Sequence, residues 1–175
     1  MDSAGLRRAY DEVLAELAAG GFEPPGDGEL SAEQIVAHLV ANDELMTEAT
    51  EAVLAGSPFA YYDLDAVHRP QLDALVAEYA GPAGSAEPVG SAGLAALGGL
   101  AARLRATSWR FCALVDRLGP AAQTPVETRL HEDVDLRVDE TLPWARTLDL
   151  HARVHLPKHL AQLRALRPQF HAHRA

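Results

Sequence analysis

The chain has 175 residues and a mass of 18.7 kDa, a length that favours one domain. Hydrophobic residues make up 48% of it and charged residues 23%, which excludes a disordered tail or a fibre. The formal net charge of -10 argues against nucleic-acid binding, because phosphate neutralisation needs a basic surface.

The cysteine content and the apolar segments indicate where in the cell the protein is expected. The single cysteine, Cys112, gives no internal disulfide, and the first residues lack the basic start and apolar core of a signal peptide. No apolar run approaches the ~20 residues that a membrane span needs. We expect a cytoplasmic protein with no membrane partner, with one domain over residues 1–167 and a tail over 168–175.

Helical periodicity dominates the chain. Apolar residues recur at alternating spacings of three and four, which places them on one stripe of a helix. Such stripes occur in residues 6–17, 35–53, 97–118 and 148–166. Ser31 and Gln34 have the spacing of a capping box at the start of the second stripe. Four such stripes predict an all-α fold, an antiparallel four-helix bundle.

The connections between these helices are less regular. A short extra helix is predicted over residues 70–79, after the second long helix, and a Gly- and Pro-rich link follows at 81–90. Residues 126–130 and 134–138 alternate apolar and polar side chains. This alternation predicts a small β-ribbon between the third and fourth long helices.

Histidines replace apolar residues on the fourth stripe. His155 and His159 hold consecutive positions of the stripe, and Gln162 holds the next one. Residues four apart on a helix are neighbours, so the two imidazoles can share a metal ion about 2.0–2.1 Å from each nitrogen. Gln162, one turn further on, could orient a ligand.

A third ligand is expected from a facing helix. His38 lies on the apolar side of the second stripe, and bundle interiors are where facing helices build metal sites. Imidazole ligands suit zinc, nickel, iron or copper alike. The alternative interpretation is that all three histidines are ordinary core residues with satisfied hydrogen bonds.

Two further residues complicate the ligand set. His151 lies four residues before His155 and could replace one of the proposed ligands, although the stripe places it at a flank. Asn42 occupies a stripe position one turn after His38 and is a further candidate. Pro157 removes an amide donor between the two histidines, so we expect a kink there, with the proline facing outward.

Two segments carry a resemblance to a known family. The sequence Ser-Ala-Glu-Gln-Ile-Val-Ala-His-Leu at residues 31–39, together with His-Leu-Pro-Lys-His-Leu-Ala-Gln-Leu at 155–163, resembles the DinB-like superfamily of metal-binding four-helix bundles. The resemblance implies a divalent metal, zinc or nickel, bound by His38, His155 and His159.

The resemblance also implies a function. Relatives include transferases that use mycothiol or bacillithiol, low-molecular-weight thiols that the metal activates, and a mycothiol-dependent maleylpyruvate isomerase with a second domain. We expect a thiol S-transferase that acts on small electrophiles, and a homodimer. The alternatives are a hydrolase in which metal-bound water is the nucleophile, and a non-catalytic metal-binding stress protein.

Overall fold

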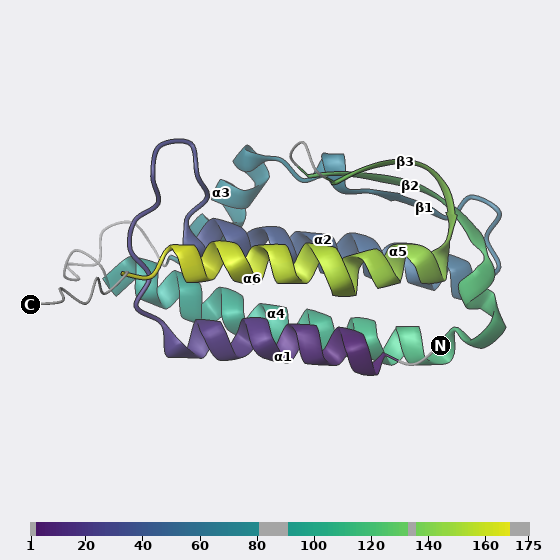
Figure 1. The fold of residues 1–175 in the computed structure, drawn as a ribbon, viewed down its shortest axis with the longest axis horizontal. Helices are drawn as coiled ribbons and strands as arrows, with labels where there is room; N and C mark the ends of the chain where they lie inside the picture. Colours follow the sequence, from purple (N-terminus) through teal and green to yellow (C-terminus); the bar gives the residue numbers. More distant parts are fainter. Residues whose placement is uncertain (1–2, 81–90, 133–135, 169–175) are drawn as a thin grey trace, which may run out of the picture.

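The computed structural model describes residues 3–80, 91–132 and 136–168. The fold is mostly helical, with a small sheet on one side (Figure 1). The helices are α1 (Ala4–Ala19), α2 (Ala32–Leu54), α3 (Arg69–Tyr79), α4 (Ser91–Arg117), α5 (Trp144–Leu150) and α6 (Leu156–Ala165). The strands are β1 (Tyr61–Asp63), β2 (Pro125–Glu132) and β3 (Leu136–Pro143). Short 3₁₀ helices cover Leu64–Ala66 and Gly119–Gln123.

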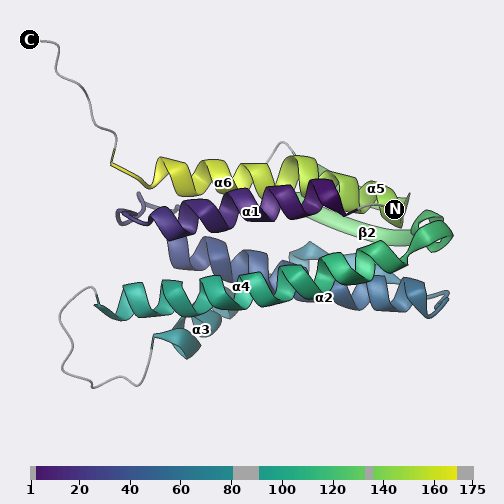
Figure 2. The same cartoon turned by 90° about the horizontal axis from the view of Figure 1, so that it is seen from below.

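Four long helical segments lie side by side: α1, α2, α4 and the continuous run from α5 to α6 (Figures 1 and 2). The ion pairs show that α2 and α4 run in the same direction, since Glu44 meets Arg103 and Glu51 meets Arg110. The expectation of antiparallel neighbours is therefore wrong for this pair. Helix α4 therefore begins at the same end of the molecule as α2 and repeats its direction.

The fold is not all-α, because the expected ribbon belongs to a three-stranded sheet of order β1-β2-β3. The antiparallel pair of β2 and β3 corresponds to the predicted ribbon, and Leu130 lies opposite Val138. Strand β3 begins at Leu136 and extends five residues beyond the expected end at 138, whereas residues 134 and 135 lie outside the described residues. Strand β1 adds to β2 in parallel, with Tyr62 opposite Thr128. Three residues are too few to show an alternating pattern, so the sequence does not indicate this strand.

Three further segments were expected: a short helix, a link and a C-terminal tail. The short helix expected over residues 70–79 is α3. The link at 81–90 lies outside the described residues, as does the expected tail apart from its first residue.

The apolar stripes form the core, as their spacing predicts. The buried positions include Leu6, Val13, Ile35, Leu39, Met46, Leu104, Phe111, Val115 and Leu148. Each such side chain contributes roughly 1.5–3 kcal/mol through burial. This packing fixes the facing helices that carry the polar side chains described below.

The last long helix contains one turn of π-helix over His151–His155. The Leu156 amide donates to the His151 carbonyl, five residues back. In an α-helix, the ring of Pro157 would crowd the Arg153 carbonyl and leave it without a donor. The irregularity expected at Pro157 therefore takes the form of a widened turn just before it, and Pro157 itself is exposed.

The predicted capping box begins α2. Ser31 Oγ accepts a hydrogen bond from the Gln34 amide at 3.2 Å, and Gln34 Oε1 accepts one from the Ser31 amide at 3.0 Å. Two amide donors at the helix start are thereby satisfied.

Ser31→Ala should lower the free energy of unfolding by about 1 kcal/mol, because it removes the side-chain acceptor of the cap. Ser31→Thr keeps that acceptor and should lower the free energy of unfolding much less. Urea unfolding followed by circular dichroism measures both changes. Equal losses in the two variants would show that the cap contributes nothing.

Candidate metal centre

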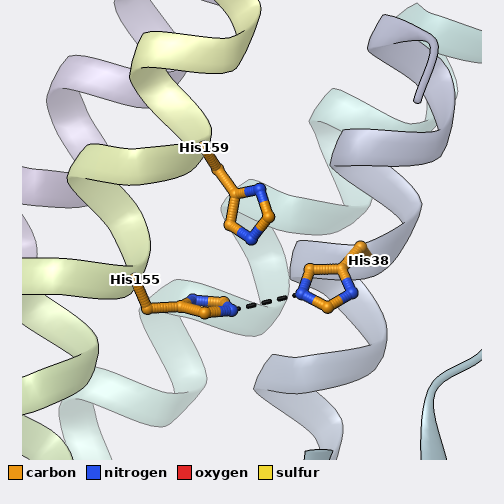
Figure 3. Close-up of side chains that lie close together, drawn as sticks. All are labelled: His38, His155 and His159. Carbon is orange, nitrogen blue, oxygen red and sulfur yellow. Dashed lines mark hydrogen bonds between the residues drawn. The ribbon is translucent and has the colours of Figure 1, made fainter. Parts of the chain in front are cut away.

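Three buried histidines from two facing segments converge in the core (Figure 3). His38 comes from α2, His155 from the end of the π turn and His159 from α6. One ring nitrogen of each lies within 4.8 Å of the other two, and the Nε2 atoms of His38 and His155 are 3.2 Å apart. The structure therefore brings together the three histidines that the sequence singles out.

The spacing of these nitrogens fits a divalent metal ion. At about 2.1 Å from each nitrogen, two ligands of a tetrahedral zinc ion lie about 3.4 Å apart. The pair at 3.2 Å is already near this value, and small ring rotations would close the widest gap, of at most 4.8 Å. The buried triad could hold a metal ion, and its neutral nitrogen donors suit zinc or nickel.

Hydrogen bonds orient the two ligands on the last helical run. His159 Nδ1 lies 2.7 Å from Gln162 Oε1, an acceptor, so Nδ1 carries the proton and Nε2 is the nitrogen whose lone pair would bind the metal. This is the orienting role expected for Gln162. His155 Nδ1 lies 3.0 Å from His151 Nδ1.

His151 is not part of the triad and does not lie at a flank. Its side chain is 1% exposed and lies on the opposite side of His155 from His38. The widened π turn explains the difference, because it brings residues four apart closer to one line than an α-helix does. Asn42 also lies outside the triad, with its Nδ2 atom 3.4 Å from His151 Nδ1.

A buried acidic residue lies behind His151. The Tyr10 hydroxyl donates to Asp43 Oδ1 and lies 2.8 Å from His151 Nε2. Thr107 Oγ1 donates to the other carboxyl oxygen of Asp43, at 3.0 Å. These contacts connect α1, α2 and α4 with the π turn.

Burial dominates the electrostatics of this region. Desolvation raises the pKa of Asp43 to about 8, although hydrogen bonds from Tyr10 and Thr107 lower it. Desolvation, and then the charge of Asp43, raise the pKa of Tyr10 well above its usual value. Burial also raises the pKa of the Cys112 thiol to about 12, so this cysteine is a poor nucleophile.

The sequence patterns do not indicate Asp43 and Tyr10 as polar partners. Tyr10 occupies an apolar stripe, where a core residue is expected. Asp43 lies four residues after Leu39 and three before Met46, two buried residues of the same helix. An acid at that spacing is the signal that could have identified it.

Comparisons with known proteins identify no relative. No family model, curated protein or solved structure matches the chain. Among the described residues, no helix has the length and apolarity that crossing a bilayer requires.

Replacing His38 by Ala should abolish the binding of one equivalent of zinc, because it removes one of three converging nitrogens. His131→Ala is the matched control, since His131 Nδ1 lies 2.7 Å from Asp65 Oδ2, away from the triad. Dialysis followed by elemental analysis measures the bound metal. Full loading of the His38 variant, or equal loss in both variants, would contradict the site.

Asp43→Asn should change how stability depends on pH. The carboxyl has a pKa of about 8 in the folded protein and about 3.9 when unfolded. Between these values the folded state keeps a proton that the unfolded chain has released. The stabilisation by this group is therefore complete below about pH 4 and is lost as the pH rises to 8.

Asn does not ionise. As the pH rises through that window, the free energy of unfolding of the Asn variant should therefore increase relative to the wild type by up to about 1.4 kcal/mol per pH unit. Urea unfolding of both proteins at pH 5 and pH 8, with the metal removed by chelator, measures this. A difference in stability that stays constant with pH would show that Asp43 is ionised throughout.

Proposed function

We propose that the protein is a metal-dependent enzyme of the DinB-like type that transfers a low-molecular-weight thiol, mycothiol or bacillithiol, to small electrophiles. The convergence of His38, His155 and His159 carries this proposal. Three protein ligands with an open position are typical of catalytic metal sites, whereas structural zinc sites have four protein ligands.

The ligand set is consistent with this chemistry. Among the described residues, the cluster that contains the triad has no cysteine or carboxylate as a fourth member. A divalent metal bound there supplies a Lewis acid that lowers the pKa of a thiol or water at the open position. The chain's own contribution is to hold three buried ring nitrogens within 4.8 Å of one another.

One cavity is connected to the triad through Gln162, although none of the three histidines lines it. It has a volume of about 430 Å³ and is lined by residues 28–30, Ile35, Arg69 and Gln162, among others. Gln162 is hydrogen-bonded to His159, and Ile35 lies one turn before His38 on α2. Arg69, which donates to the Gly28 carbonyl at 2.9 Å, and Glu29 place one charge of each sign at this cavity.

Zinc-loaded and nickel-loaded protein should conjugate mycothiol or bacillithiol to an electrophile such as monochlorobimane, with adduct fluorescence as the readout. The His38→Ala variant should lose this activity and the His131→Ala variant should keep it, because His38 belongs to the metal site and His131 does not.

Metal binding without conjugation of either thiol would contradict the transferase proposal. Hydrolysis of p-nitrophenyl esters by the same loaded protein would then favour the hydrolase, in which water takes the place of the thiol.

A further inference from the structure

Three buried side chains, His151, Tyr10 and Asp43, form a continuous hydrogen-bonded path behind His155, here called the relay. The path runs from His155 Nδ1 to His151 Nδ1 over 3.0 Å, and from His151 Nε2 to Tyr10 Oη over 2.8 Å. It ends at Asp43, to which Tyr10 donates. All three relay side chains are 2% exposed or less, so water does not compete for these contacts.

The proton positions in the relay follow from Asn42. The Tyr62 hydroxyl donates to Asn42 Oδ1 at 2.6 Å, which turns the amide nitrogen toward His151 Nδ1. An amide NH₂ group only donates, so His151 Nδ1 is an acceptor. His155 Nδ1 must therefore carry the proton that joins the two rings.

The rest of the relay has the same direction. A neutral imidazole that accepts at Nδ1 carries its proton on Nε2, so His151 donates to Tyr10, which in turn donates to Asp43. The direction is unchanged if Asp43 is protonated on Oδ2, because Thr107 Oγ1 then accepts from that oxygen and donates to the Leu104 carbonyl, which lies 3.2 Å away. Every donor in the path thus points away from the metal site.

The contact with His38 agrees with this assignment. When Nδ1 of His155 is protonated, its Nε2 carries a lone pair, and that atom lies 3.2 Å from His38 Nε2. In the metal-free protein His38 can donate a hydrogen bond to this lone pair. A metal ion at the triad would use the same lone pair.

We propose that the relay is a positioning device for His155. It holds the ring in the tautomer whose Nε2 binds the metal, and it ends at the buried carboxyl group of Asp43, whose ionised form would offset the positive charge of an ion bound by three neutral ligands. Asp43 is the one acidic side chain that is buried in the part of the chain that the structure describes. Carboxylate-supported histidines of this kind raise the basicity of metal ligands.

The two ligands on the last helical run are therefore supported differently. Gln162, a neutral and partly exposed amide, orients His159. A buried path that ends in a titratable carboxyl orients His155. The affinity for metal should then depend on residues of α1 and α2 that do not touch the ion.

Two variants separate the parts of the relay. Tyr10→Phe removes one hydroxyl and breaks the path, whereas Asp43→Asn keeps an acceptor for Tyr10 but removes the group that can ionise. Thr50→Val is the matched control. It breaks a different buried hydrogen bond of α2, the one that Thr50 Oγ1 accepts from Trp144 Nε1 at 3.0 Å.

Zinc affinity, measured by competition with a chelating indicator, should fall about 10- to 100-fold in Tyr10→Phe and in Asp43→Asn. Thr50→Val should lower the melting temperature yet leave zinc affinity within about twofold of the wild type. If Tyr10→Phe lowers the melting temperature but leaves zinc affinity within twofold, as the control does, the network is only structural and the proposal is wrong.

A second measurement needs neither metal nor turnover. Long-range ¹H–¹⁵N NMR of the metal-free protein should show His155 protonated at Nδ1 and His151 at Nε2, with a mixture of tautomers in Tyr10→Phe. The opposite tautomers in the wild type would overturn the relay. The relay rests on the metal site of the proposed function, but zinc binding with no thiol transfer would reject the transferase alone.

Discussion

The fold depends on a constraint set by burial: a polar side chain that leaves water must find its hydrogen bonds inside the protein. The core of this protein contains four such groups around one point, the triad and His151. Each of them has an interaction with another buried or half-buried side chain. Two of these contacts, His38 with His155 and His151 with Tyr10, join different helices. Polar contacts as well as apolar packing therefore specify how the helices are placed along one another.

The chain topology makes this placement achievable. Helices α2 and α4 run in the same direction, so Asp43 and Thr107 meet at the same level as the ion pairs on the outer surface. Helix α1 brings Tyr10 to that level from another side. A slip of one turn, about 5.4 Å, in any of these helices would leave a buried donor or acceptor without a partner.

The sequence predicts the ligands better than it predicts their support. His155, His159 and Gln162 lie on one helix, so their spacing alone makes them neighbours, and His38 needs only the assumption that its apolar face points inward. The pairing of Tyr10 with Asp43 joins two helices whose relative level no local pattern defines. Strand β1 escapes prediction for a similar reason, because its partner lies more than sixty residues away.

The π turn sets the register between the two halves of the last helical run. It holds one residue more than the α-helical turn it replaces. If the same five residues closed into a regular α-helix, each would turn through about 100° and the segment after them would rotate relative to the segment before them. His159 and Gln162 would then turn away from His38, although every ligand would still be present. Losing one residue inside the turn would instead restore the α-helix and leave His159 and Gln162 on the same face, so we expect related chains that share the site to have either this π turn or a regular helix one residue shorter.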